Sequence, residues 1–432
     1  MNLAFVLSST KKPLMPCSPA RARRLLKAKR ASVFCRQPFT IILKDRASGK
    51  TQSIAWQLDP GSRTTGMALV GEFPEQGRMM QWASELHHRG HRIREKILAR
   101  RVARRKRRFR KTRYRAPRFL NRRRPEGWLP PSLQSRVDNV MSWTLKIQRR
   151  VPITSIAMEL VRFATQHLMN PEVTGIEYQR GELFGYEVRE YLLEKWNRIC
   201  AYCRTTDVPL EIEHLIPRSR GGSNRVSNLT LACTPCNQRK GNQTAQEFGY
   251  PQLMKQASQP LRDAAAVNST RLALYDNLKK LGVDLSVCSG GRTKYNRIQQ
   301  GYPKTHWIDA ACVGVNGIQV HLDPKTQPLN ITATGRGTRQ VVKTDAFGFP
   351  RTQAGRVKRV RGFQTGDLVQ LTQPHGKYAG RWIGALSSVR RTGKFDLKTT
   401  RGIVTAPASR FTLFQRAGGY IYAAQFIRNG KR

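Results

Sequence analysis

The sequence is poor in acidic residues. Its 432 residues contain 27 Asp and Glu against 78 Lys and Arg, which gives a formal net charge of +51 at pH 7. A chain with this charge repels itself unless a polyanion neutralises it. Because the phosphate backbone carries a dense array of negative charges, we predict that nucleic acid is the main partner of this protein.

Long apolar runs are absent as well. No stretch resembles the roughly 20 apolar residues of a membrane-spanning helix. The opening residues 1–7 lack the basic region and the small-residue cleavage site of a signal peptide. We therefore predict a strand at the start of the chain, no membrane partner, and a cytoplasmic protein.

The eight cysteines do not have the pattern of a disulfide framework. Four of them form two C-x-x-C pairs, Cys200 with Cys203 and Cys233 with Cys236, and 29 residues lie between the pairs. Four thiolates in two close pairs suit tetrahedral Zn²⁺ and leave no coordination position open for a substrate. We predict a structural zinc site and a reducing compartment.

The first 50 residues have the pattern of a small α+β unit. Ser18 followed by Pro19 predicts the N-cap and first turn of a basic helix that ends near residue 30. Apolar runs at 3–7 and 39–43 flank this helix and are typical of short strands.

Residues 89–124 form the most basic segment. They contain 19 Lys and Arg and one acidic residue, Glu95. A thin apolar stripe at near-helical spacing, with no proline before Pro117, predicts a helix of some 25 residues. A solvated helix face would mix both charges, so we expect this helix to lie against phosphates, where each Arg can pair with two oxygens.

Three acidic residues lie at the ends of predicted elements. A buried strand at 54–58 ends at Asp59, a strand at 154–160 carries Glu159, and a helix that begins at Thr305 carries Asp309. Further predicted elements are a strand at 66–70, a helix at 133–149, a zinc-bearing block at about 185–250, a helical pair at about 258–281, and short strands at 367–371, 381–386, 394–399, 402–405 and 411–414. The short strands between glycine turns indicate a small β-barrel-like domain at the C-terminus.

Each of these acids alone has a structural explanation, as a turn Asp, an edge-strand Glu or a helix N-terminal Asp favoured by the helix dipole. Together they resemble the acids of the RuvC nucleases, which have an RNase H-like fold. The resemblance implies that Asp59, Glu159 and Asp309 hold two metal ions. It also implies that His306, one helical turn before Asp309, assists proton transfer.

A second group of polar residues lies between and just after the cysteine pairs. Glu213 directly precedes His214, Asn228 follows, and Asn237 comes directly after the last cysteine. A lone histidine is more often structural, but this order and spacing resemble the ββα-metal site of the HNH nucleases. The resemblance implies that His214 is the general base, that Glu213 and Asn237 hold one Mg²⁺, and that Asn228 fixes the histidine loop. Many members of that family have Asp at the position of Glu213.

The order of these segments resembles the IscB family, transposon-associated RNA-guided nucleases that are ancestral to the CRISPR nucleases with paired domains. Residues 12–16 carry the Pro-Leu-Met-Pro signature of that family. The resemblance covers about residues 1–320 by motif and the remainder by position only. It implies an α/β fold with an RNase H-like (RuvC) core split in three, an inserted zinc-stapled ββα-metal HNH domain, an N-terminal α+β PLMP domain, an Arg-rich bridge helix and a small β-rich C-terminal domain. The implied boundaries are PLMP 1–52, RuvC-I 53–88, bridge helix 89–125, RuvC-II 126–182, HNH 183–252, RuvC-III 253–325, and a C-terminal domain 326–432 that contacts the target-adjacent motif or RNA.

The resemblance also implies partners and cofactors. These are a large noncoding guide RNA (omega RNA), double-stranded target DNA with a target-adjacent motif, Mg²⁺ or Mn²⁺, and structural Zn²⁺, with one protein monomer per RNA. The resemblance further implies a prokaryotic cytoplasmic protein that acts at the nucleoid. In the R-loop, HNH would cut the strand paired to the guide and RuvC the displaced strand. The guide RNA would be held by the bridge-helix residues Arg94, Arg101, Arg104, Arg105 and Arg108. RNA or DNA phosphates would be bound by Arg336, Arg339, Lys343, Arg356, Lys358, Arg359 and Arg361, while Phe347, Phe349 and Trp382 are better explained as core than as base-stacking platforms.

Two other functions are consistent with parts of the pattern. One is an unguided endonuclease of the homing type, which would cut a specific sequence without RNA. The other is an RNA chaperone or maturation factor in which both sites are vestigial. The complete set of acids together with His214 argues against the second.

Overall fold

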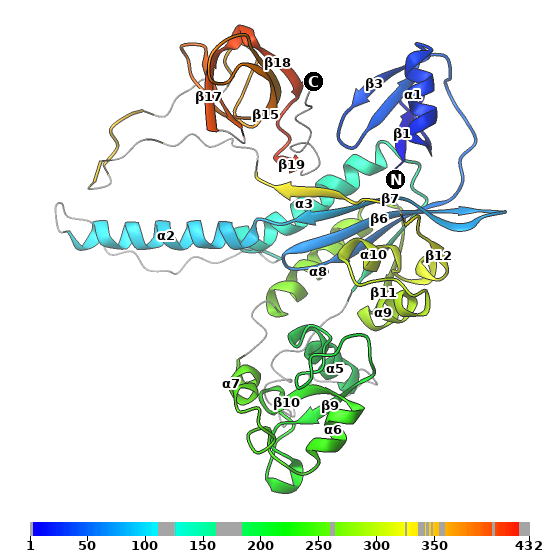
Figure 1. The fold of residues 1–432 in the computed structure, drawn as a ribbon, viewed down its shortest axis with the longest axis vertical. Helices are drawn as coiled ribbons and strands as arrows, with labels where there is room; N and C mark the ends of the chain where they lie inside the picture. Colours follow the sequence, from blue (N-terminus) through cyan, green and yellow to red (C-terminus); the bar gives the residue numbers. More distant parts are fainter. Residues whose placement is uncertain are drawn as a thin grey trace.

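The computed structural model describes residues 3–110, 125, 127–160, 184–259, 264–324, 326–335, 342, 345–346, 349–353, 359–399 and 402–422. Four sheets organise this part of the chain. Figure 1 shows a large central sheet, with the N-terminal unit and the C-terminal strands on one side of it and the zinc-bearing block on the other. The mixed α/β class predicted from the sequence is confirmed.

The N-terminal unit is a four-stranded sheet with one helix. Ser18 caps the helix as predicted, because its hydroxyl accepts a hydrogen bond from the Arg21 amide at 3.3 Å. Strand β1 pairs parallel to β4 and antiparallel to β2. The elements are β1 (Ala4–Leu7), β2 (Pro13–Cys17), α1 (Pro19–Lys27), β3 (Ala31–Cys35) and β4 (Thr40–Leu43), and the strand order is β2-β1-β4-β3.

The central sheet is built from segments that are far apart in the sequence. Its order is β11-β8-β5-β6-β7-β13-β19, and β12 pairs with β7 off this path. Strands β5, β6 and β7 form an antiparallel meander, whereas β8 runs parallel to β5 and β11 parallel to β8. The strands are β5 (Ile54–Pro60), β6 (Thr64–Phe73), β7 (Gly77–His87), β8 (Ser155–Glu159), β11 (Asp284–Cys288), β12 (Val320–His321), β13 (Leu329–Ala333) and β19 (Tyr420–Tyr422).

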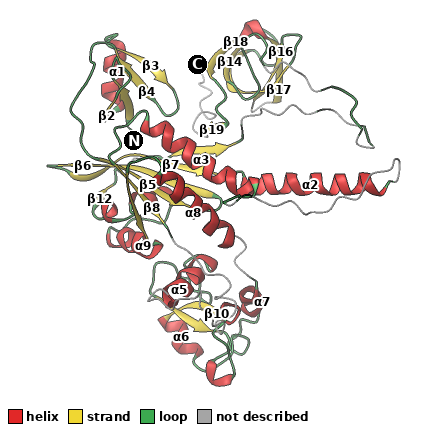
Figure 2. Ribbon diagram, turned by 180° about the vertical axis from the view of Figure 1, so that it is seen from behind, coloured by secondary structure: helices red, strands yellow, loops and turns green. Residues whose placement is uncertain are grey.

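Side-chain alternation along β5 assigns the two faces of this sheet. Trp56 and Leu58 pack in one core cluster with residues of α3 (Pro131–Gln148) and α8 (Ala264–Lys279), and both helices are seen in front of the sheet in Figure 2. Gln57 points to the other face, where its amide donates to the Val313 carbonyl at 3.3 Å. Asp59 shares the parity of Gln57 and therefore faces the same side as α9 (Gly290–Gln299), α10 (His306–Ala311) and the short helix η3 (Val315–Gly317).

The arginine-rich helix is α2 (Gly90–Phe109), and Figure 1 shows it projecting away from the central sheet. Most of its few apolar side chains are exposed, with Leu98 at 57% and Phe109 at 70% of their full accessibility, and Ile93 is partly buried. The five arginines predicted to hold guide RNA all lie on its exposed surface. The helix is confirmed to Phe109, and Pro117 lies outside the described residues.

The zinc-bearing block has a core of its own and is inserted between β8 and α8. Its two strands pair antiparallel, so that His214 lies opposite Leu229. The elements are α5 (Phe184–Lys195), β9 (Leu210–His214), η1 (Arg218–Arg220), η2 (Val226–Asn228), β10 (Leu229–Cys233), α6 (Thr234–Lys240) and α7 (Gln252–Ser258).

The C-terminal strands form a five-stranded antiparallel sheet in the order β17-β16-β15-β14-β18. Trp382 is buried in its core, as predicted, whereas Phe349 is 43% exposed. Of the basic residues predicted to contact phosphates, Arg359 and Arg361 lie in the described part; the remaining five, and Phe347, lie outside it. The elements are β14 (Leu368–Gln373), β15 (Gly380–Val389), β16 (Lys394–Thr399), β17 (Gly402–Pro407), η4 (Ala408–Arg410) and β18 (Phe411–Gln415).

Several elements differ from the expectation. Strands β13 and β19 join the central sheet, although we predict from the sequence that their residues belong to the C-terminal domain 326–432. The helical pair expected at 258–281 is a short α7 that ends at Ser258, followed by α8. Within the described residues, no helix combines the length and the apolar character that crossing a membrane requires.

Candidate active sites

Three carboxylates meet at one edge of the central sheet. Asp59 and Glu159 lie at the carboxyl ends of the parallel neighbours β5 and β8, and such ends meet at the same edge. Asp309 reaches this edge from α10. With His306 they line a cavity of about 250 Å³. The structure thus brings together all four residues predicted for the RuvC-like site.

A glycine allows α10 to lie directly against β6. A Cβ atom on Gly66 would stand 1.8 Å from the His306 carbonyl oxygen, so no larger residue fits without moving the helix. Thr305 caps α10 and accepts a hydrogen bond from the Ile308 amide at 3.3 Å. The imidazole Nδ1 of His306 consequently stands 3.3 Å from Oδ2 of Asp59.

Two buried arginines hold the carboxylates. Arg271 of α8 places Nη2 3.2 Å from Oε1 of Glu159 and donates from Nε to the Pro60 carbonyl at 3.1 Å. Arg297 of α9 places Nε 2.9 Å from Oδ1 of Asp309. Neither arginine was predicted from the sequence, because Arg271 is 112 residues from Glu159 and Arg297 lies on a different helix from Asp309.

The acids are crowded in a space that excludes most water. Burial, and then the charge of Asp59, raise the pKa of the Glu159 carboxyl to about 7. The same two causes raise the pKa of Asp309 to about 6. The hydrogen bond to Asp59 raises the pKa of His306. Hard oxygen donors that repel one another in this way fit divalent magnesium, because a bound cation favours their ionised forms.

The zinc-bearing block lies against this cavity. Leu193 and Arg198 line it, together with Lys294 and Lys304 from the sheet side. Arg297 connects the two parts, because its Nη2 lies 3.6 Å from Oδ1 of Asp207 in the zinc-bearing block. The carboxylates therefore have a cationic surround that can contact a phosphodiester.

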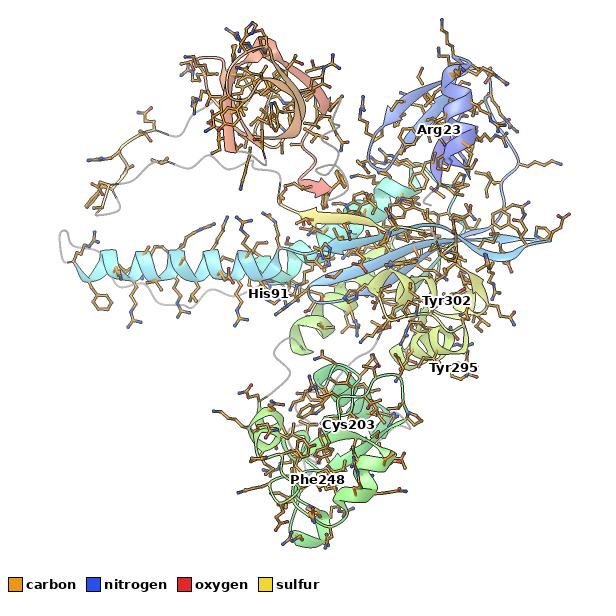
Figure 3. All side chains as sticks on the ribbon, in the orientation of Figure 1. Arg23, His91, Cys203, Phe248, Tyr295 and Tyr302 are labelled. Carbon is orange, nitrogen blue, oxygen red and sulfur yellow. The ribbon has the colours of Figure 1, made fainter. Side chains whose placement is uncertain are left out.

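Four cysteine Sγ atoms, from Cys200, Cys203, Cys233 and Cys236, lie within 4.8 Å of one another. This spacing and donor set fit the tetrahedral zinc site predicted from the sequence. In Figure 3, Cys203 and Phe248 mark this block at the lower end of the molecule. The zinc site lies beside the aromatic core of the block rather than in the carboxylate cavity.

We expect Cys236→Ser to unfold the zinc-bearing block while the central sheet stays folded. A structural zinc contributes about 10–16 kcal/mol of folding free energy in small domains, and a buried serine cannot replace the thiolate. Bound zinc measured by atomic absorption should fall, and limited proteolysis should cut within residues 200–252. Cys17→Ser, outside the cluster, is the matched control. A Cys236→Ser protein that keeps its zinc and its protease resistance would contradict this assignment.

The histidine of the second site lies at the end of β9. His214 Nε2 is 2.9 Å from Oδ1 of Asn224. The side chain of Asn228 accepts from the Ile216 amide at 2.9 Å and donates to the carbonyls of Ile216 and Ser223 at 3.0 and 2.9 Å. These bonds close the loop that follows His214, which is the arrangement expected of a residue that fixes this loop.

The acids of β9 face α6. Asn237 donates to Oε2 of Glu211 at 2.6 Å, and Thr234 donates to the other oxygen at 2.9 Å. Glu213, two residues further on the same strand face, is bound by Tyr202 and Lys240. The metal roles of Glu213 and Asn237 stay predictions. Sequence reasoning missed Glu211 as the partner of Asn237, although the two-residue period of a strand places it beside Glu213.

Comparison with known proteins gives two family matches. Residues 4–181 match the family described as RRXRR protein, and residues 200–252 match the family described as HNH endonuclease. No curated protein matches the sequence. Among solved structures, Streptococcus thermophilus Cas9 in complex with the GGAA PAM is 14% identical, with a TM-score of 0.24, and the same protein with the AGAA PAM is 14% identical, with a TM-score of 0.22. Each likeness covers 60% of this chain, which spans about a third (32%) of the Cas9 chain.

The HNH match covers the zinc cluster, His214, Asn228 and Asn237. It identifies residues 200–252 as an HNH endonuclease domain, in agreement with the endonuclease predicted from the sequence. The RRXRR match followed by the HNH match fits an IscB-like RuvC/HNH nuclease, which confirms the resemblance found in the sequence motifs.

Proposed function

We propose that this protein is an RNA-guided, magnesium-dependent DNA endonuclease that cuts each strand of an R-loop at a separate site. The observation that carries the proposal is the presence of two distinct acid-bearing sites on one chain with a net charge of +51. One is the carboxylate cavity, and the other is in the zinc-bearing block, which we call the HNH block from here on. Two sites allow two strands to be cut, and the charge requires a polyanionic partner.

The carboxylate cavity is proposed as the RuvC site, which cuts the displaced strand. The sheet order β11-β8-β5-β6-β7 supports an RNase H-like core that is assembled from three chain segments. Asp59, Glu159 and Asp309 would hold two Mg²⁺ ions, which activate water and stabilise the leaving oxygen when bound. His306, beside Asp59, is placed to move a proton at that edge of the cavity.

The HNH block is proposed to cut the strand paired to the guide. Since Asn224 Oδ1 can only accept, this contact fits the neutral tautomer in which His214 Nε2 carries the proton and Nδ1 is the acceptor. A neutral imidazole nitrogen can take a proton from water near pH 7. Glu213 and Asn237 supply oxygen ligands of the kind that Mg²⁺ prefers.

The guide RNA is proposed to lie along α2. This helix has 20 residues, so it is about 30 Å long, and its predicted contact arginines are exposed. Among the described residues, most side chains of α2 are exposed, so this basic surface is open to a polyanion. The C-terminal sheet is proposed to contact the target-adjacent motif.

The proposal that cleavage requires a guide RNA is tested with protein from which RNA has been removed. We expect no cleavage of any defined duplex by RNA-free protein in magnesium buffer, and cleavage of a matching duplex when the copurifying native RNA is added back. Sequencing that RNA identifies the guide, and a duplex with a scrambled target is the control. Efficient sequence-specific cutting by the RNA-free protein would instead support an unguided endonuclease of the homing type.

A further inference from the structure

The carboxylate of Glu213 is held at both oxygens by side chains. Tyr202 donates from its hydroxyl to Oε2 at 2.7 Å, and the Lys240 ammonium lies 2.6 Å from Oε1. Glu213 is 6% exposed, and the Lys240 side chain is completely buried. A buried charge with two such partners has one well-defined orientation.

Lys240 also connects Glu213 to the neighbouring histidine. Its ammonium donates to the His214 carbonyl at 2.9 Å, so one group binds the side chain of one residue and the backbone of the next. Lys240 lies on α6 three residues after Asn237, on the same face of the helix. The contact therefore fixes α6 relative to the end of β9, where the predicted base and metal ligands lie.

Tyr202 connects Glu213 to the zinc site. It stands between the zinc-cluster residues Cys200 and Cys203 in the chain. Its ring packs edge-on against Phe248 at 5.2 Å and Tyr250 at 5.1 Å between centroids. The position of the Tyr202 hydroxyl is therefore fixed by the loop from Cys200 to Cys203, which we call the zinc knuckle, and by the aromatic packing.

These contacts leave the carboxylate able to bind a cation. Each carboxylate oxygen has two acceptor positions, so one hydrogen bond to each oxygen leaves two positions in all. We propose that Tyr202 and Lys240 are positioning residues of the HNH site, which orient Glu213 and the backbone of His214 for a divalent cation, and that Tyr202 transmits the order of the zinc knuckle to that site. The inference rests on the proposed function of the HNH block.

The test uses Tyr202→Phe, which removes the hydroxyl and keeps the ring, with Tyr250→Phe as the matched control. Losing a hydrogen bond to a charged group should raise the half-saturating Mg²⁺ concentration for the guide-paired cut about tenfold. The displaced-strand cut in the same protein should not change. Mn²⁺ binding, followed by electron paramagnetic resonance on the RNA-free full chain in an Asp59→Ala background, should weaken by a similar factor, whereas Tyr250→Phe should leave both readouts unchanged.

An unchanged Mg²⁺ dependence and unchanged Mn²⁺ binding in Tyr202→Phe, with zinc retained, would overturn the inference. If Tyr202→Phe loses zinc, Lys240→Met carries the same test, because Lys240 lies outside the zinc knuckle. Weaker Mn²⁺ binding by Lys240→Met supports positioning; stronger binding would show that Lys240 only competes with the metal, and would refute it. Failure of the proposed function is distinguishable, since His214→Ala would then leave the guide-paired cut intact.

Discussion

Asp59→Ala is expected to slow cutting of the displaced strand by about a thousandfold or more, while the guide-paired strand is cut at the normal rate. Metal ions supply several kcal/mol of transition-state stabilisation in such sites, and each 1.4 kcal/mol is about tenfold in rate. Asp59 stands at the centre of the proposed metal site, because its charge raises the pKa of both Glu159 and Asp309 and its carboxylate contacts His306.

The measurement uses an R-loop substrate with a different fluorescent label on each strand, so that both cuts are followed in one reaction. Asp45→Ala is the matched control, because Asp45 is an exposed acid paired with Arg30 in the N-terminal unit. Removing Asp59 also removes repulsion among buried acids, so the metal-free variant should melt no lower than the parent protein. A folded Asp59→Ala protein that loses both cuts equally would refute the two-site proposal.

The sequence predicted those parts of the sites that depend on local chemistry. Ser18 and Thr305 cap their helices as their positions indicate, and the C-x-x-C pairs converge as the zinc pattern requires. Asp59 is the sixth residue of a strand whose seven residues are all buried, and the mostly apolar residues 54–58 that precede it predict such a strand. Each of these features depends on a few neighbouring residues, so a short motif is sufficient to predict it.

The sequence did not predict partners that only the tertiary fold brings together. Arg271 is separated from its partner Glu159 by the inserted block, and Arg297 and its partner Asp309 lie on two different helices, so no spacing rule predicts either contact. Strand β11 (Asp284–Cys288) was missed because its residues are half-exposed at the sheet edge and show no clear alternation. The joining of β13 and β19 to the central sheet likewise depends on pairing between distant segments.

The two sites differ in how they are assembled. The carboxylate cavity draws its acids from positions 59, 159 and 309, so it exists only when the central sheet is complete. The HNH residues all lie between Cys200 and Lys240, in a block with its own core and zinc cluster. A local site within a separately folded block can therefore be disabled without loss of the other.

His214→Ala should show this separation most clearly. General-base catalysis contributes about a hundredfold to ten-thousandfold, so the guide-paired cut should slow by a factor in that range while the displaced-strand cut continues. Asn228 makes three hydrogen bonds that close the following loop, whereas the histidine ring adds only its contact with Asn224, so the fold of the block should survive the substitution.

The structure suggests a matched control and a chemical test for this variant. His321→Ala removes an exposed histidine at the end of β12 and should leave both cuts unchanged. Added imidazole should restore part of the guide-paired cut in His214→Ala, because a small neutral base can occupy the space of the missing ring next to Asn224. Equal loss of both cuts with zinc retained, or a guide-paired cut that persists at the parent rate, would exclude His214 as the base of an independent site.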